Sequence, residues 1–371
     1  MSLPCKRLRV MFIGVALCLG LQSAHADKLD DDLQTVWESL WDQRGTPQPL
    51  LRWEQPITYR IHGQELALHR QHIEKALKAA TEMAQLQILD VSQASDPAMT
   101  VMLDLEVVSD AELEDNQPCV TQYLAHTGGT LREVRVKMRA GNVWRCAFHE
   151  MMHAMGVIGH PSGKTVLSYF PYRRDVLMDL DKLMLDARYS PFMHANSTPL
   201  EALVVLSQFV AKQEDLAVEP SVATKRARAF NLKKLREMQA MATGDGEVPT
   251  IILRSGRASE RFIQSAKPMA AHFVGMAYFR GTIVSKNLAT SSIWFKQGAE
   301  GGFLPAQIMW GYLLANGAGV EVDLQAGHAW MTLASKSVPS VADVLLQIEK
   351  KMGAEELESA RAQPLPTVTP P

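Results

Sequence analysis

The chain has 371 residues, of which 47% are hydrophobic and 21% are charged, and its formal net charge is −2 at pH 7. A chain of this length and apolar content can form two domains with cores of their own. The near-neutral charge argues against a protein that binds nucleic acid.

The first 26 residues show the pattern of a secretory signal peptide. Lys6, Arg7 and Arg9 precede an apolar run over 10–21, and the small residues of a cleavage site follow at 24–26. We therefore expect cleavage after Ala26 and a periplasmic or secreted protein. No later apolar run is long enough to span a membrane.

Residues 27–50 are expected to form an N-terminal segment, for which the role of a pro-region stays open. A folded domain is expected over 51–195. It begins with a strand at 53–61 and a helix at 71–86, where Ile73, Leu77, Ala80 and Ala84 recur at helical spacing.

Two alternations of apolar and polar residues predict strands with one buried face each. The apolar residues of the first alternation are Val101, Leu103, Leu105 and Val107. Those of the second are Val134, Val136 and Met138. The second strand leads into the segment that carries the main motif of the chain.

Two cysteines remain after signal removal, Cys119 and Cys146. An isolated pair in an oxidising compartment more often bonds than stays free, so a disulfide between them is predicted. It would span 146 − 119 = 27 residues. A loop of that size gives a stabilisation of about 3.5 kcal/mol by the chain-entropy relation. The alternative role for Cys146 is that of a metal ligand.

His149, Glu150 and His153 form an HExxH motif, which is followed by Gly156 and His160. Residues four apart lie on one face of a helix, so His149 and His153 can bind one metal ion. Glu150 can take a proton from zinc-bound water and is therefore the predicted general base. A catalytic zinc needs a third ligand, and a left-handed turn at Gly156 would return His160 to the metal. A buried structural cluster of histidines is the alternative.

The stretch from His149 to His160 reads HExxHxxGxxGH and resembles the HExxHxxGxxH motif of the metzincin clan of zinc endopeptidases. One residue is inserted, so that Gly159 stands where the clan has its last histidine. The resemblance covers about 51–189. It implies an α+β, zincin-like catalytic domain with a mixed sheet, an active-site helix and zinc (Zn2+) as the cofactor.

The resemblance also implies a turn beneath the metal, for which 165–169 is the nearest match. Tyr169 of this turn would stabilise the oxyanion of a tetrahedral intermediate; an ordinary core tyrosine is the alternative. A helix over 177–189 would close the domain.

The strand before the active-site helix would, by the same resemblance, be a sheet edge to which an extended peptide substrate adds. The residues expected to bind substrate there are Arg132, Val134, Val136 and Met138. The alternative is a half-solvated strand whose basic residues protect an edge from aggregation.

Residues 196–264 are expected to form a helical connector, with helices at 200–210 and 221–241. Over 265–340, five residue pairs match at one offset, since 311 − 275 = 36. The pairs are Gly275 with Gly311, Gly281 with Gly317, Val284 with Val320, Leu288 with Leu324, and Trp294 with Trp330. Such a period is typical of paired helices stacked as a solenoid.

This pattern resembles the SEL-type repeat, a relative of the tetratricopeptide repeat. The resemblance implies a module that binds proteins or peptides, whereas the alternative is an extension of the core. A capping helix at 341–352 and a disordered, Pro-rich tail are expected within 341–371.

The leading hypothesis from the sequence is a secreted or periplasmic zinc endopeptidase. His149, His153 and His160 would hold the metal, Glu150 would drive water onto the peptide carbonyl, and the repeats would select a protein or peptide substrate. The rival hypothesis is a non-enzymatic scaffold of the cell envelope, with a vestigial metal site and repeats that recruit a partner.

Overall fold

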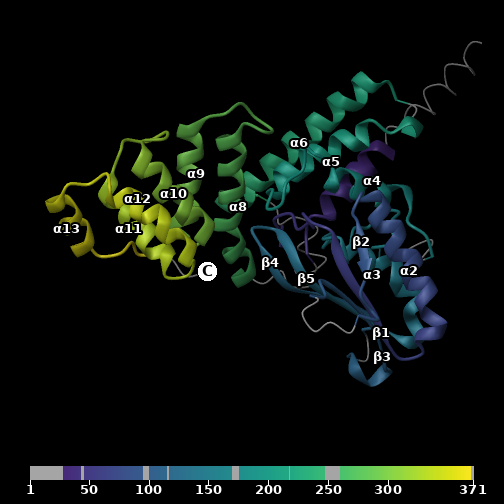
Figure 1. Ribbon diagram of the computed structural model, residues 1–371. Coiled ribbons are helices and arrows are strands. Elements are labelled where there is room, and N and C mark those ends of the chain that lie inside the picture. Colours follow the sequence, from purple (N-terminus) through teal and green to yellow (C-terminus); the bar gives the residue numbers. More distant parts are fainter. Residues whose placement is uncertain are drawn as a thin grey trace, which may run out of the picture. The chain divides into compact units, whose positions relative to one another are not determined.

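The computed structural model describes residues 28–42, 46–94, 100–114, 117–168, 175–216, 218–246 and 260–368 (Figure 1). The expected signal peptide, 1–26, lies outside these residues, as does Tyr169. No helix within the described ranges is long and apolar enough to cross a membrane.

The chain divides into two compact units. The first comprises Met1–Asp42, Gln48–Ser197 and Val205–Phe230. The second comprises Gln43–Pro47, Thr198–Val204 and Asn231–Pro371. The first unit is an α/β domain with a mixed sheet, and the second is helical.

The first unit is built on a five-stranded sheet with the order β2-β1-β3-β5-β4. The strands are β1 (Ile57–Gly63), β2 (Ile88–Asp90), β3 (Leu103–Val108), β4 (Cys119–Thr127) and β5 (Thr130–Arg139). Neighbouring strands from β2 to β5 are parallel, whereas β4 runs antiparallel to β5. The three strands expected from sequence are confirmed as β1, β3 and β5.

The expectation that Arg132, Val134, Val136 and Met138 lie on a sheet edge is wrong. These residues belong to β5, which pairs with β3 on one side and with β4 on the other. The last three are fully buried, with 0% exposure. The reason is that the sequence did not predict β4. This strand forms a hairpin with β5 through Gly128 and Gly129, both at positive φ. The sheet edge next to β5 is therefore β4, and β2 forms the other edge.

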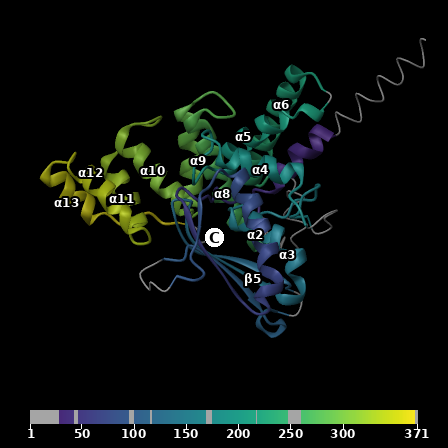
Figure 2. The same ribbon diagram turned by 45° about the vertical axis from the view of Figure 1, so that its right-hand side comes forward.

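One face of the sheet is covered by α2 (Leu66–Met83) and α3 (Val143–Ala154), which pack on each other and on the strands (Figure 2). Ile73, Leu77 and Ala80 of α2 are buried, as their helical spacing predicts. The helix expected at 177–189 is α4 (Asp179–Tyr189). The helix α3 carries the HExxH motif and lies directly over β5 and β4.

The residues 28–38 form a further helix that the sequence reading did not expect. Its apolar side chains Leu29, Leu33 and Val36 are all at 0% exposure. Burying three aliphatic side chains contributes several kcal/mol to stability. This segment is thus part of the core of the first unit.

Helices make up the rest of the described chain. They are α5 (Pro199–Ala211), α6 (Pro220–Thr243), α8 (Glu260–Arg280), α9 (Leu288–Glu300), α10 (Leu304–Asn316), α11 (Leu324–Ser335), α12 (Ala342–Glu349) and α13 (Ala354–Ala362). The expected helices at 200–210, 221–241 and 341–352 are confirmed as α5, α6 and α12.

Two helical hairpins, α8 with α9 and α10 with α11, repeat the same local chemistry. Gly281 and Gly317, which are 36 residues apart in sequence, end the first helix of each hairpin at φ values of 74° and 64°. Asn287 and Asp323 then cap the second helix by accepting a backbone N–H bond at 3.0 and 2.8 Å. The matched positions thus have matched structural roles.

The end of the described chain differs from the expected disordered tail. Residues 364–368 form neither helix nor strand, in agreement with their prolines. Val368, however, packs against an apolar cluster formed by the repeats. For the part of the tail that reaches Val368, the expectation of disorder is therefore wrong.

Candidate metal centre

Three histidines from two segments meet at one point. His149 and His153 lie one turn apart on α3, with their Nε2 atoms 3.1 Å apart. The chain then reverses at Gly156, where φ is 89° and a Cβ would lie 2.2 Å from a backbone oxygen. The Nε2 atom of His160 consequently lies 3.2 Å from each of the other two. The inserted residue does not keep His160 from the site.

Backbone carbonyls fix the ring orientation of two of the histidines. Nδ1 of His149 lies 2.9 Å from the carbonyl oxygen of Val166, and Nδ1 of His153 lies 2.6 Å from that of Val157. A carbonyl only accepts, so both Nδ1 atoms carry a proton, and in the neutral form of each ring the Nε2 atom then presents a lone pair. Convergent lone pairs repel one another unless a cation lies between them.

The spacing of the three nitrogens fits a small divalent cation. A tetrahedral zinc with ligand distances of about 2.0–2.1 Å holds its nitrogen ligands roughly 3.3–3.4 Å apart. The observed separations of 3.1–3.2 Å differ from this by only a few tenths of an ångström. Among the residues that the structure describes, this is the one group of three or more potential ligands that could hold a metal ion.

Burial keeps two of the histidines neutral. Burial and the neighbouring His160 and His149 hold the pKa of His153 well below its usual value. Burial and the proximity of His149 lower the pKa of His160 to about 3. The neutral imidazole is the form that binds metals, so both rings are ready to bind at neutral pH.

Glu150 lies beside the three histidines. Its side chain is 3% exposed, and its Oε1 lies 3.9 Å from Nε2 of His149. Burial raises the pKa of this carboxyl, while the nearby His149 and a hydrogen bond from Thr121 act in the opposite direction. A carboxylate with a raised pKa is a stronger proton acceptor than an ordinary glutamate.

The strand β4 runs along α3 and contacts it at three successive turns. Cys119 forms a disulfide with Cys146, which confirms the predicted bridge. Two residues further along β4, Thr121 contacts Glu150, four residues further along α3. Tyr123 then donates a 2.7 Å hydrogen bond to the carbonyl oxygen of His153. The disulfide is compatible with a periplasmic or secreted protein.

Asp181 of α4 supports the histidine cluster through the turn at 165–168. Its carboxylate accepts hydrogen bonds from the backbone N–H groups of Val166, at 3.1 Å, and Met178, at 2.8 Å. The carbonyl of the same Val166 orients His149. Asp181 is 0% exposed, and burial raises its pKa to about 7.

Two residues of this site, Thr121 and Asp181, were not predicted from the sequence. The predicted disulfide carried a signal for the first, because Thr121 faces the same side of a strand as Cys119, and Glu150 lies about one helical turn beyond Cys146. Asp181 is the third residue of α4, where a carboxylate commonly accepts backbone N–H groups. Nothing in the sequence connected that carboxylate with Val166.

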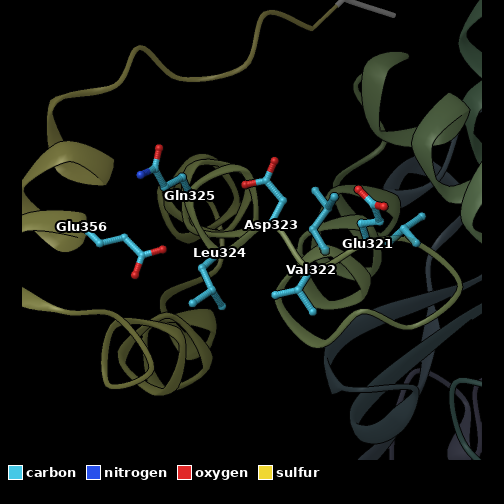
Figure 3. A pocket seen from close by; sticks show the side chains of 8 residues that line it. Glu321, Val322, Asp323, Leu324, Gln325 and Glu356 are labelled. Carbon is cyan, nitrogen blue, oxygen red and sulfur yellow. The ribbon is translucent and has the colours of Figure 1, made fainter.

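The second unit contains a separate groove of about 590 Å³ (Figure 3). Its lining residues are Leu314, Val320, Glu321, Val322, Asp323, Leu324, Gln325 and Glu356. They combine apolar side chains with three carboxylates and include no basic side chain. The carboxylates do not form a group that could hold a metal ion within the described chain.

The helical hairpins match a known repeat. The model of the Sel1 repeat family matches residues 268–303 and 304–337, whose starts differ by 304 − 268 = 36. This confirms the SEL-type repeats expected within 265–340. The second unit therefore contains two Sel1 repeats, a repeat of helical hairpins. No curated protein matches the chain.

Two solved structures are similar to the chain at low identity. One is c5321, a protective antigen present in uropathogenic Escherichia coli strains and displaying an SLR fold, with 16% identity over 58% of this chain and 51% of that chain, at a TM-score of 0.26. The other is a Sel1 repeat protein from Oxalobacter formigenes, with 22% identity over 45% of this chain and 55% of that chain, at a TM-score of 0.22. The chain thus spans about half the length of each.

Proposed function

We propose that the first unit is a zinc-dependent endopeptidase of zincin-like, metzincin-like type. The observation that carries the proposal is the convergence of three Nε2 atoms within 3.2 Å of one another, beside a buried carboxylate. Zinc, when bound there, would act as a Lewis acid and favour ionisation of water. His149, His153 and His160 would hold it.

The proposed role of Glu150 follows from its place and its environment. As general base, it accepts a proton from the attacking water, and it then returns the proton to the leaving nitrogen of the peptide bond. The hydrogen bond from Thr121 holds one carboxylate oxygen, Oε2, while Oε1 faces His149. One oxygen is thus anchored, and the other is directed toward the metal ligands.

The proposed substrate is an extended peptide that pairs with β4. This strand ends the sheet, so one side of its backbone has no neighbouring strand among the described residues. An extended peptide can pair with such an edge by main-chain hydrogen bonds. Because Thr121 and Tyr123 of β4 contact Glu150 and His153, a peptide on this edge would lie next to the catalytic group.

A second candidate function is a non-enzymatic scaffold that recruits a protein partner through its Sel1 repeats. The family match over 268–303 and 304–337 favours this reading, because repeats of stacked helices offer extended surfaces for binding proteins. The two functions are compatible if the repeats choose the substrate. They differ in one requirement: the endopeptidase needs a metal ion at the histidine cluster, whereas the scaffold does not.

The test compares the mature wild type with Glu150→Gln and with the control Asp186→Asn, which changes an exposed acid of α4. Metal content is measured by elemental analysis, and cleavage is measured on a library of unstructured peptides. We expect about one zinc per chain in all three proteins, and cleavage at least about a thousandfold slower only in Glu150→Gln.

Two outcomes would oppose the proposal. Undiminished cleavage by the pure Glu150→Gln protein would remove the assigned base. A wild type that holds no stoichiometric zinc and takes up none on titration would leave the scaffold as the function of the chain.

A further inference from the structure

The helix at 28–38 ends against the loop that carries the third histidine. Glu38, at the end of this helix, is 4% exposed. Its Oε2 atom accepts two hydrogen bonds from Ser162, one from the backbone N–H at 2.8 Å and one from the hydroxyl at 2.9 Å. Gln34, one turn earlier, donates a 3.0 Å bond to Oε1 and so holds the carboxylate in place.

The same two segments also meet backbone to backbone. The N–H of Gly159 donates a 3.1 Å hydrogen bond to the carbonyl oxygen of Ser39. A Cβ at Gly159 would lie 2.4 Å from the carbonyl oxygen of Glu38, and one at Gly163 would lie 2.0 Å from Oγ1 of Thr35. Only residues without a side chain allow this approach.

These contacts bracket His160. Gly159 is bonded to Ser39 immediately before it, and Ser162 is bonded to Glu38 two residues after it. His149 and His153 are positioned by the rigid helix α3, whereas His160 lies on a loop without regular structure. The segment 35–39 contacts this loop on both sides of His160 and so supports the position of its ring.

We propose that Glu38 is a positioning residue of the metal centre and that the helix at 28–38 is a permanent part of it. The inference rests on the proposed function for the identity of the ligand at the three histidines. It assigns a structural role to part of the segment 27–50, for which the sequence left open the role of a removable pro-region. It also gives a role to the residue inserted in the HExxHxxGxxGH motif, because Gly159 contacts Ser39 and holds the loop against it.

The role of Glu38 differs from a general contribution to folding. A structural carboxylate lowers the stability of the whole unit when it is removed. A positioning carboxylate also loosens one loop and weakens metal binding while α3 and the disulfide keep their structure. Mutation of an outer residue that orients a metal ligand typically weakens metal binding about 10- to 100-fold.

The experiment compares mature wild type, Glu38→Ala, Glu38→Gln and the control Asp31→Asn, an exposed acid of the same helix. Hydrogen exchange of the peptide segment 157–164 is measured first, in the zinc-free proteins. Zinc affinity is then measured by competition with a chelator. We expect Glu38→Ala to exchange at least about tenfold faster in this segment and to bind zinc about 10- to 100-fold more weakly.

The conservative variant separates position from charge. Glu38→Gln keeps an oxygen that can accept from Ser162. We therefore expect it to retain most of the slow exchange over 157–164 and most of the zinc affinity. Asp31→Asn should match wild type. If Glu38→Ala does not fold, Ser162→Ala decides the question, because it removes one of the two bonds from an exposed side chain. Ser162→Ala should give a smaller increase in the exchange rate over 157–164 and a smaller loss of zinc affinity.

Unchanged hydrogen exchange over 157–164 in the Glu38→Ala and Ser162→Ala proteins would overturn the inference, whatever the zinc result. Faster exchange together with an unchanged zinc affinity would also overturn it. A wild type that binds no zinc at all would instead count against the proposed function, while the exchange result would still decide whether Glu38 holds the loop.

Discussion

Oγ1 of Thr121 lies 2.6 Å from Oε2 of Glu150 and donates a hydrogen bond to it. The two residues are 29 positions apart in the chain and come from β4 and α3. This bond links the β4 edge of the sheet to the proposed base. It also opposes the effect of burial, which raises the pKa of Glu150. A change in the strand should therefore alter the chemistry of the helix.

Thr121→Val removes this hydrogen bond and keeps the shape of the side chain. The pKa of Glu150 should rise further, so the acid limb of the pH profile of kcat/KM should move to higher pH. At the acid end the loss should reach about tenfold, because a hydrogen bond to a charged group contributes about 1.5 kcal/mol. Thr127→Val at the exposed end of β4 is the control, and an acid limb that stays in place in Thr121→Val would contradict the prediction.

Gly159→Ala places a methyl group 2.4 Å from a backbone oxygen and 2.7 Å from two backbone carbons. Backbone atoms cannot rotate away, so either the helix or the loop must move. We expect a loss of about 2 kcal/mol in the free energy of unfolding and a roughly tenfold weaker zinc affinity.

The control for Gly159→Ala is Gly141→Ala, because a Cβ at Gly141 meets nothing within 4 Å. Both variants are compared by urea denaturation and by zinc titration. Equal behaviour of the two proteins would show that the approach of the loop to Ser39 is not required.

The disulfide between Cys119 and Cys146 ties β4 to the start of the motif helix. Its separation of 27 residues gives a contribution of about 3.5 kcal/mol by the chain-entropy relation. The double variant Cys119→Ser, Cys146→Ser should lose roughly this amount in urea denaturation. Added reductant should lower the stability of wild type toward that of the variant and leave the variant unchanged; a response of the variant to reductant would contradict the assignment.

His272 should make the repeats sensitive to acid. Its ring packs against Phe273, Phe295 and Phe303, and burial, with Arg280 nearby, lowers its pKa to about 3. The unfolded chain takes up a proton near pH 6.5, whereas the folded unit resists it. The stability due to the neutral ring is therefore fully present above about pH 6.5 and is lost as the pH falls toward 3.

His272→Leu removes this proton uptake. Between pH 7 and pH 4, wild type should lose on the order of 3 kcal/mol more stability than His272→Leu, by the linkage between proton binding and unfolding. Denaturation of both proteins at the two pH values measures the difference. Parallel losses in the two proteins would show that His272 does not set the acid sensitivity.

The features that the sequence determined are those set by local spacing. An HExxH segment on a helix puts His149 and His153 on one face wherever the helix lies, because the rise and turn of the backbone fix that relation. The 36-residue offset of Gly275 with Gly311 likewise marked the Sel1 repeats, since each hairpin needs the same glycines at the same places. The disulfide followed from there being two cysteines left to pair.

Tertiary structure alone decided the relations between segments far apart in the chain. The edge strand was misassigned because alternation shows which face of β5 is buried but not which strands lie beside it. The support of His160 by Glu38 could not be read from sequence, since the two residues are held together by the path of the chain around a shared core. Local periodicity reports one element at a time, and a histidine cluster that joins a helix to a loop depends on how the elements pack.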